Sequence, residues 1–344
     1  VAPPDSQQKA LDYLNGKSYQ AALSDKTLSF EIINQINELK ANDLLSQIIL
    51  KGTSATDFHL FVQDFMKNNR FRQVNFQTFD HAFSENFGWH LSEIFPKYFD
   101  RQELPAFQVK NFRIKRILSP TEEEEDPWTP HTKFRIEFDV LNQSDVDGVI
   151  TMHLGTAIYK AGPDRRVDRM LYTPRTFSVK AREAKKIIFI CPHPVVSHSI
   201  YTGLSKNRPN IFDIHDKTIT LEKGMESTRD SIAGEESISP AIFFPPANEI
   251  IVDNEDDNFQ ITNPPAPWLK RFLGLNHNHH THSSTAVSHW EYTLMPDCFG
   301  EYCLSCLRKR TGKGESSLTW TTPINKKGKY KIYAYIPNIS YSHE

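Results

Sequence analysis

The chain has 344 residues, of which 38% are hydrophobic and 24% are charged, and its formal net charge is -2. This length and composition predict two or three globular domains with hydrophobic cores. The nearly balanced charge gives no electrostatic basis for a nucleic-acid partner, and no apolar run is long enough to cross a bilayer, so we expect neither nucleic-acid binding nor membrane insertion by this chain.

The first part of the chain, residues 1–107, is predicted to be helical. Apolar residues at helical spacing predict helices over Ser6–Gly16, over Phe30–Leu50 with Ser29 as its N-cap, over Asp57–Met66, and over a segment that begins near Thr78. In the helix Asp57–Met66, one stripe carries Phe58, Phe61, Val62, Phe65 and Met66. This spacing predicts a helical core that is rich in aromatic side chains.

The parts that follow resemble a known family. Phe79, Ala82 and Phe83 face inward in the next predicted helix, Phe87-Gly88-Trp89 ends it, and Glu103-Leu104-Pro105-Ala106-Phe107 leads into a β-region. This order is similar to the last helices of the catalytic domain in the zinc aminopeptidases of the gluzincin M1 family. The resemblance covers about residues 1–210. It implies a bacterial parent protein whose upstream peptidase domain binds zinc and is the partner of this chain.

No catalytic residue is assigned in this chain. The M1 family carries His-Glu-x-x-His, in which two histidines bind zinc and the glutamate activates water, whereas the His-Glu pair of this sequence is His343-Glu344. The family's Gly-x-Met-Glu-Asn motif is also absent, since Gly224-Met225-Glu226-Ser227 lacks its spacing. Both elements would lie upstream of Val1, so we expect the chain to be a piece of a longer protein.

Residues 108–204 are predicted to form an antiparallel β-sandwich. The period of the apolar pattern changes to two after Gln108, and strands are expected over 134–140, 149–154, 175–179 and 186–190. Apolar and charged residues alternate over 134–140, which predicts a strand with one buried face. Residues 205–248 contain many serine and charged residues and end with several prolines, so they are predicted to be a linker.

The third part, residues 249–344, is predicted to be a second β-sandwich. Strands are expected before the acidic turn Asp253–Asp257, over Ser317–Ile324 and over Lys329–Tyr335. This pattern is similar to the C-terminal domain of golvesin and xanthan lyase, a carbohydrate-binding-like jelly roll. A His- and Cys-rich insertion at about 268–314 and missing final strands depart from it. The expected fold class is therefore α+β and multidomain, with a helical region and two β-sandwiches, the second one incomplete.

The third part contains two sets of candidate ligand-binding residues. Acidic turns can hold calcium through carboxylate oxygens, and the candidates here are Asp253, Glu255, Asp256 and Asp257. An exposed turn at a strand end is the alternative for these four. Glycan binding requires solvent-facing aromatic rings, for which the candidates are Trp268, Trp290, Tyr292 and Tyr335. Aromatic residues at alternating strand positions also build cores, so burial of these rings is the alternative.

The insertion supplies candidate zinc ligands, which are His277, His279, His280, His282, Cys298, Cys303 and Cys306. Imidazoles and thiolates are the ligands that zinc prefers, and the spacing of Cys303 and Cys306 is a common half-site. Two alternatives remain, a disulfide between two of the cysteines, as in a secreted protein, and a loop without any ligand. The whole chain has four cysteines, too few for a disulfide scaffold.

We therefore expect a non-catalytic part of an M1-like zinc metallopeptidase, which supports the peptidase fold, shapes its substrate cleft and carries a module for a surface glycan. The alternative is a stand-alone extracytoplasmic protein for glycan binding or adhesion, without peptidase activity. A third hypothesis is a metal-responsive module centred on the insertion. Relatives of this architecture imply a location in the periplasm or on the cell surface. Structural zinc or calcium are the cofactors that the candidate sites would hold.

Overall fold

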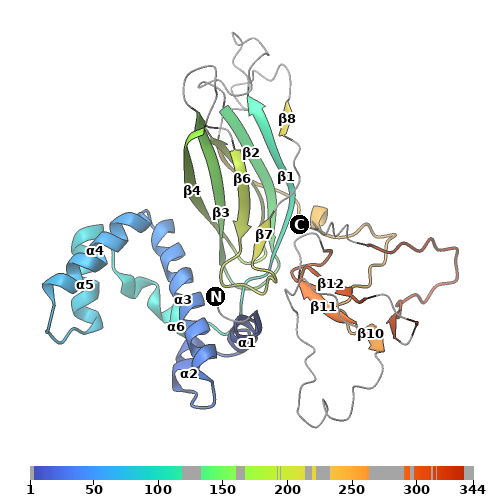
Figure 1. The fold of residues 1–344 in the computed structure, drawn as a ribbon, viewed down its shortest axis with the longest axis horizontal. Coiled ribbons are helices and arrows are strands. Elements are labelled where there is room, and N and C mark those ends of the chain that lie inside the picture. Colours follow the sequence, from blue (N-terminus) through green and yellow to red (C-terminus); the bar gives the residue numbers. More distant parts are fainter. Residues whose placement is uncertain are drawn as a thin grey trace.

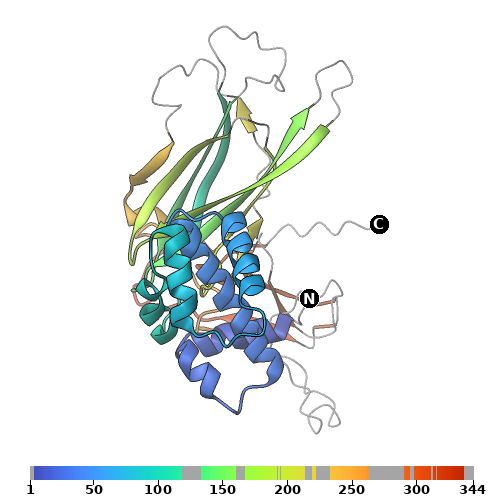
Figure 2. The same ribbon diagram turned by 90° about the vertical axis from the view of Figure 1, so that its left-hand side faces the viewer.

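A computed structural model describes residues 4–117, 133–159, 167–191, 193, 195–213, 219–221, 233–262, 290–294, 298–310, 313–314 and 316–336. In chain order it contains a helical region, a two-layered β-sandwich, and a third region of short antiparallel strands (Figure 1). The helical and third regions lie on opposite sides of one end of the sandwich (Figures 1 and 2). The predicted fold class, α+β with helices followed by antiparallel sheets, is confirmed.

The helices begin and end at residues that the sequence marks. Ser29 Oγ accepts a hydrogen bond from Ile32 N at the predicted N-cap, and Ser54 and Asn75 cap the next two helices in the same way. Gly88, with a φ of 78°, ends the helix before it in the left-handed conformation that glycine adopts readily. Among the described residues, no helix is long and apolar enough to span a bilayer. The helices are α1 (Pro4–Leu14), α2 (Tyr19–Ser24), α3 (Phe30–Leu50), α4 (Ala55–Asn68), α5 (Phe76–Phe87), η1 (Leu91–Glu93) and α6 (Phe95–Asp100).

Helices α4 and α5 pack against each other through an aromatic cluster. The Phe83 side chain is fully buried, and its ring centroid lies 6.1 Å from that of Phe58, 5.7 Å from that of Phe61 and 4.9 Å from that of Trp89. All three contacts are edge-to-face, the arrangement that aromatic quadrupoles favour. The predicted stripe of α4 is confirmed except at Met66, which is 67% exposed because the stripe is wider than the surface that its neighbours cover.

We expect Phe83→Ala to lower the free energy of unfolding by about 3–5 kcal/mol, because it leaves a cavity at the centre of the cluster. Phe71 in the loop between α4 and α5 is fully exposed and serves as the control. Denaturant unfolding followed by circular dichroism measures both variants. Equal losses for Phe83→Ala and Phe71→Ala would contradict the burial of this cluster.

The sandwich consists of two sheets that face each other. Neighbouring strands are antiparallel except for β8, which runs parallel to β1. The predicted strands over 134–140, 149–154, 175–179 and 186–190 lie within β2, β3, β4 and β5. One sheet has the order β8 (Ile219–Leu221), β1 (Phe107–Ile117), β2 (Lys133–Asn142), β5 (Ala184–Cys191), β9 (Gly234–Ser237), and the other β4 (Val167–Val179), β3 (Gly148–Tyr159), β6 (Val195–Tyr201), β7 (Ile211–Asp213).

Alternate residues of the strands form the core between the two sheets. Ile136, Phe138 and Val140 of β2 are fully buried, and so are Ile150 and Met152 of β3 on the opposing sheet. Successive side chains of a strand point to opposite faces, so a period of two places these residues on the inner face. The alternation in the sequence therefore predicted the buried face of β2 correctly.

The charged residues on the other face of β2 are also buried, contrary to the prediction. Glu137 and Asp139 are 7% and 4% exposed. Glu137 Oε1 lies 3.4 Å from Lys115 Nζ, and Asn111 Nδ2 donates a hydrogen bond of 2.7 Å to Asp139 Oδ2. Because β2 lies in the middle of its sheet, long side chains from the neighbouring strands cover its outer face as well.

Part of the predicted linker, residues 205–248, packs on the sandwich. Strand β9 pairs with β5, and η3 (Pro240–Phe243) buries Phe243 against Leu141 and Ala184. An unpaired edge of β5 would leave backbone N–H and C=O groups without partners, and β9 satisfies them. The composition of this segment predicted a linker, because composition does not show whether a segment pairs with the edge of a sheet.

The third region contains two short antiparallel pairs, β10 (Phe259–Thr262) with β13 (Ser317–Trp320) and β11 (Glu291–Leu294) with β12 (Ser305–Arg308). The strand predicted to begin at Ser317 is confirmed, although it ends at Trp320. Lys329–Tyr335 forms no strand, and within it Ile332 and Tyr333 are 94% and 83% exposed. An alternating segment becomes a strand only where a neighbour accepts and donates its backbone hydrogen bonds, and this segment pairs with no strand among the described residues.

The helical region shares a buried core with the sandwich. Leu104 on the chain that leaves α6 and Leu204 after β6 pack against Ala10, Leu11, Leu14, Ala22, Ile36 and Leu39 of α1, α2 and α3. Beside this core, Lys40 of α3 is 1% exposed. Its Nζ donates a hydrogen bond of 2.6 Å to Tyr98 O and lies 4.2 Å from the centroid of the Tyr98 ring. Burial lowers the pKa of Lys40 to about 8.

This pKa predicts a pH dependence of stability. An unfolded lysine has a pKa of 10.5, so between pH 8 and pH 10 the unfolded chain binds a proton that folded Lys40 has released. The free energy of unfolding of the wild type should therefore rise relative to that of Lys40→Met over this range, by about 2–3 kcal/mol. Chemical denaturation at several pH values measures the difference. Lys51→Met is the control, because the Lys51 side chain is 46% exposed, and an equal pH dependence for both variants would contradict the assignment.

Candidate binding site

A cavity of about 570 Å³ opens where the helical region, the sandwich and the third region meet. Its charged lining residues are Glu103, Arg182, Lys206 and Glu301, and its exposed aromatic residues are Phe244 and Tyr302. Glu103 lies on the chain that leaves α6, Arg182 on the turn between β4 and β5, and Tyr302 on the loop before β12. The cavity thus forms only when segments that are far apart in the sequence come together.

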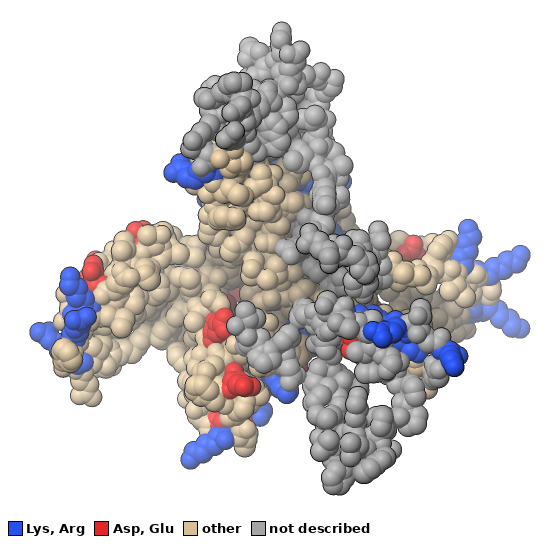
Figure 3. Space-filling model, viewed as in Figure 1, with Lys and Arg blue, Asp and Glu red and all other residues tan. Residues whose placement is uncertain are grey.

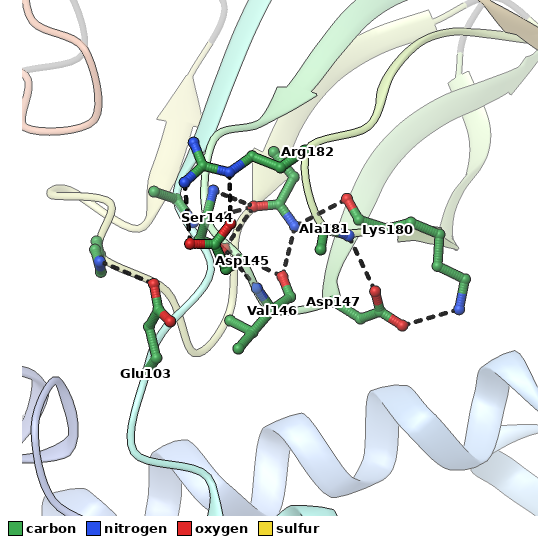
Figure 4. A network of polar contacts seen from close by, with 11 residues as sticks. Glu103, Ser144, Asp145, Val146, Asp147, Lys180, Ala181 and Arg182 are labelled. Carbon is green, nitrogen blue, oxygen red and sulfur yellow. Dashed lines mark hydrogen bonds and ion pairs between the residues drawn. The ribbon is translucent and has the colours of Figure 1, made fainter.

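Asn142, at the end of β2, lines the cavity and fixes the two turns beside it. Its side chain is fully buried, and its Oδ1 accepts hydrogen bonds from Ser144 Oγ at 2.8 Å and Ser144 N at 3.1 Å. Its Nδ2 donates to Val146 O at 2.8 Å and to Lys180 O at 3.2 Å. One amide therefore ties the turn after β2 to the turn after β4, and Figure 4 shows both turns.

Ion pairs on the two turns hold Arg182 at the cavity. Arg182 Nε and Nη2 donate to the two carboxylate oxygens of Asp145 at 2.7 and 3.1 Å (Figure 4). These hydrogen bonds hold the pKa of Asp145 below its usual range. Burial alone would raise the pKa of Asp147, but hydrogen bonds from Ala181 N and Lys180 Nζ lower it overall. Both carboxylates are thus ionised at neutral pH and fix the cations beside them.

Asn207 fixes the side of the cavity that carries Lys206. Phe107 N donates a hydrogen bond of 2.9 Å to Asn207 Oδ1, and Asn207 Nδ2 donates one of 2.7 Å to Phe107 O. Lys206 N donates to Pro105 O at 2.8 Å, and Lys206 Nζ lies 3.6 Å from Glu103 Oε1. The start of β1 and the chain after β6 are therefore held together next to the cavity.

Arg208 connects this junction to the third region and to α1. Arg208 N donates a hydrogen bond of 2.8 Å to Tyr302 O, and Leu304 N donates one of 2.6 Å to Arg208 O. The Arg208 guanidinium also forms an ion pair with Asp12 of α1. These contacts place the loop that carries Glu301 and Tyr302 at the cavity. Acidic, basic and aromatic groups together suit a polar ligand that has hydroxyl groups and an apolar face.

Several candidate ligands of the zinc hypothesis lie outside the described residues, namely His277, His279, His280 and His282. Cys298, Cys303 and Cys306 are described and buried. The Cys298 side chain lowers the pKa of the Cys306 thiol, whereas burial and the charge of Glu255 raise the pKa of the Cys303 thiol. The described part of the chain holds no group of three or more His, Cys, Asp or Glu residues arranged for a metal ion. The zinc site stays a prediction, because its histidines are not described.

The acidic turn predicted for calcium is held by its own hydrogen bonds. Asp256 Oδ2 accepts a hydrogen bond of 2.8 Å from Asp253 N, and Glu255 Oε1 accepts one from Ser305 Oγ. Burial, with the charges of Glu255 and Asp256, raises the pKa of Asp253 to about 6. Asp257 is exposed. Three of the four carboxylates, those of Asp253, Glu255 and Asp256, thus accept protein hydrogen bonds, and the calcium site stays a prediction.

The aromatic candidates for glycan binding differ in exposure. Trp268 lies outside the described residues, and Trp290 and Tyr292 are half-buried. Tyr292 Oη donates a hydrogen bond of 3.1 Å to Asn254 O. Tyr335 is 65% exposed, and its ring centroid lies 6.0 Å from that of Phe299. Of the described candidates, Tyr335 therefore has the exposure that stacking on a sugar requires.

Sequence reasoning missed the residues that line the cavity. Arg182 and Lys206 lie in polar turns, and Phe244 lies within the predicted linker, so none of them belongs to a recognisable motif. The sequence feature closest to the cavity that could have been noticed is Asn142-Gln143-Ser144. It is a turn sequence, and its first residue is buried in the structure. Burial of a turn asparagine depends on the tertiary structure and could not be read from its neighbours.

Comparisons with known proteins give no family. No family model matches the chain, and no curated protein matches it. Among solved structures, a β-glucosidase from Listeria innocua in complex with glucose matches with 14% identity over 29% of this chain and 15% of that chain, at a TM-score of 0.18. A GH3 β-glucosidase from Bifidobacterium adolescentis (16% identity, 35% and 19% coverage) and EmGH1 from Erythrobacter marinus (13% identity, 34% and 16%) have the same TM-score. This chain spans less than a fifth of each structure, and the likeness supports no conclusion on activity.

We expect Asn142→Ala to lower the free energy of unfolding by about 3 kcal/mol, because it leaves several buried backbone groups without partners. Asn86→Ala is the control, since Asn86 is exposed and its Nδ2 donates to Ala82 O within one helix. Thermal and denaturant unfolding measure both variants. A loss below 1 kcal/mol for Asn142→Ala would show that this amide does not hold the two turns.

Proposed function

We propose that this chain is a non-catalytic part of an M1-like zinc metallopeptidase, in which the helical region and the sandwich support the peptidase fold and the third region binds a glycan. The observation that carries the proposal is the core shared between helices and sandwich. Leu104 and Leu204 complete a cluster formed by α1, α2 and α3, so the two parts form a continuous hydrophobic core. A support for a neighbouring domain requires such a rigid connection.

Polar contacts across the same junction support this role. The Arg101 guanidinium donates to Asp147 O, which joins the end of α6 to the turn after β2. Arg208 forms an ion pair with Asp12, which joins the end of the sandwich to α1. Together with the Asn207–Phe107 hydrogen bonds, these contacts resist hinge motion between the helices and the sandwich.

The surface of the helical region supports a contact with a further domain. Large apolar side chains on and between α4 and α5 are exposed, namely Leu60 (52%), Met66 (67%), Phe71 (103%) and Phe76 (41%). Burial of exposed apolar side chains favours association with a partner. In the proposed arrangement the upstream peptidase domain covers them, and that domain holds the zinc ion.

Exposed aromatic and basic side chains support glycan binding by the third region. Phe299, Tyr302 and Tyr335 are 42%, 38% and 65% exposed, and Tyr302 lines the cavity. Lysine and arginine side chains project from the edge of the molecule that the third region occupies (Figure 3). Aromatic rings stack on the apolar faces of sugars, while charged and amide groups bond their hydroxyl groups. A location in the periplasm or on the cell surface follows from this proposal.

The alternative function is a stand-alone glycan-binding or adhesion protein. It is favoured by the number of exposed aromatic residues in the third region, including Trp320 (48%) and Tyr333 (83%). Both functions include glycan binding, but only the leading proposal requires a peptidase domain. The coding sequence upstream of the Val1 codon separates them, because the leading proposal requires His-Glu-x-x-His followed by a glutamate ligand. Absence of that motif from the full-length protein would leave the alternative.

We expect the full chain to bind members of a panel of immobilised oligosaccharides, and Tyr302→Ala to weaken binding of the best member roughly tenfold. Loss of one stacking ring costs about 1 kcal/mol or somewhat more. Tyr172→Ala is the matched control, because Tyr172 is a 71% exposed tyrosine on β4 of the sandwich. Calorimetric titration measures the affinities. Equal affinities for the two variants would contradict the placement of the glycan site, and failure to bind any oligosaccharide would contradict glycan binding.

A further inference from the structure

One segment of the third region, residues 316–336, combines basic and apolar side chains. Its basic residues are Lys326, Lys327, Lys329 and Lys331, and its sequence contains no aspartate or glutamate, so the segment has a formal charge of +4. The whole chain has a formal net charge of -2. The positive charge is therefore local, and the balance of the whole chain conceals it.

The four lysines of this segment are available to an external anion. All four side chains are exposed, and no carboxylate of the described residues forms an ion pair with any of them. Lysine and arginine side chains project from the edge of the molecule that the third region occupies (Figure 3). A partner with a negatively charged surface would be attracted to this edge.

The same segment exposes large apolar side chains. Ile332 and Ile336 are 94% and 84% exposed, and Tyr333 and Tyr335 are 83% and 65% exposed. Each isoleucine would gain free energy on removal from water. Tyrosine has an apolar ring and a polar hydroxyl group, which is why it is enriched where a bilayer meets water.

The folded part of the third region holds this segment at several points. At its start, β13 pairs with β10. Near its end, the ring centroid of Tyr335 lies 6.0 Å from that of Phe299. Between these points, Tyr330 Oη donates a hydrogen bond of 2.9 Å to Lys326 O. The lysines and the isoleucines are therefore presented together, on one short stretch of attached chain.

We propose that residues 326–336 bind the surface of a bilayer that contains anionic lipids. The lysines pair with the phosphate groups, and Ile332, Ile336 and the tyrosines enter the boundary between headgroups and acyl chains. Binding is peripheral, and the segment does not cross the bilayer. The proposal goes beyond the proposed function and does not depend on it.

The combination of charge and apolar surface distinguishes a bilayer from other partners. A second copy of the segment would bring the lysines of both chains together, which like-charge repulsion opposes. A nucleic acid or an anionic polysaccharide would pair with the lysines but would leave Ile332 and Ile336 in water. A bilayer with anionic lipids supplies a negative surface and an apolar interior to the same segment.

Sedimentation with lipid vesicles tests the proposal on the full chain. We expect binding to vesicles of phosphatidylcholine and phosphatidylglycerol in equal parts, and binding at least about tenfold weaker to vesicles of phosphatidylcholine alone. Binding to the anionic vesicles should weaken as the salt concentration rises, because salt screens the lysines. Absence of binding to the anionic vesicles would overturn the proposal, and so would equal binding to both kinds of vesicle.

A charge variant tests the location of the site. We expect the double variant Lys329→Gln/Lys331→Gln to bind the anionic vesicles roughly tenfold more weakly. Lys26→Gln/Lys67→Gln is the matched control, because it changes the net charge equally at two exposed lysines of the helical region. Equal losses for the two double variants would show that net charge alone governs binding and would overturn the assignment to this segment.

An apolar variant separates a bilayer from an anionic polysaccharide. We expect Ile332→Ser/Ile336→Ser to weaken vesicle binding roughly tenfold, because it removes apolar surface from the boundary region. Leu23→Ser is the control, since Leu23 of α2 is 55% exposed, and Tyr302→Ala should also leave vesicle binding unchanged. Full vesicle binding by the isoleucine variant, together with binding of polygalacturonate that requires Lys329 and Lys331, would overturn the proposal in favour of an anionic polysaccharide.

Discussion

The two hydrogen bonds between Asn207 and the backbone of Phe107 join the start of β1 to the chain after β6, at the place where the three parts of this protein meet. They join residues 100 positions apart, and both residues are fully buried. Without Asn207, the first amide and carbonyl of β1 would be buried without partners, which costs more than the hydrogen bonds themselves contribute. The helices end at Asp100, before β1 begins at Phe107, and Arg208, next to Asn207, is hydrogen-bonded to the loop that carries Tyr302, so this junction lies where the three parts meet.

The cavity is a consequence of this junction. Its charged residues come from the chain after α6, from the turn after β4, from the chain after β6 and from the third region, and its aromatic residues come from the end of η3 and from the third region. Each cation has a carboxylate partner, Asp145 for Arg182 and Glu103 for Lys206. The pairs are partly exposed, so they contribute little to stability, and their main effect is to hold the groups in position for a ligand.

The loop before β12 combines a rigid attachment with an exposed aromatic surface. Arg208 holds its backbone on both sides, through Tyr302 O and Leu304 N. Phe299 and Tyr302 remain exposed on it. A loop whose backbone is fixed loses little entropy when a ligand binds.

The sequence by itself determined the local elements of the fold. Ser29 caps α3 as predicted, because a serine oxygen satisfies a free backbone N–H at a helix start whatever lies around it. The alternation in β2 identified Ile136, Phe138 and Val140 as core residues, since strand geometry alone places them on one face. The exposure of Met66 on α4 was not predictable from helical spacing, because spacing does not tell how much of a stripe the neighbouring helix covers.

Only the tertiary structure decided which of these elements find partners. Strand β9 forms within a segment of linker composition because the edge of β5 accepts it, whereas the strongly alternating segment Lys329–Tyr335 lies beside no described strand and forms none. The candidate site followed the same rule. The cavity brings together Glu103, Arg182 and Tyr302, because contacts between distant residues depend on the path of the chain and not on their separation in the sequence.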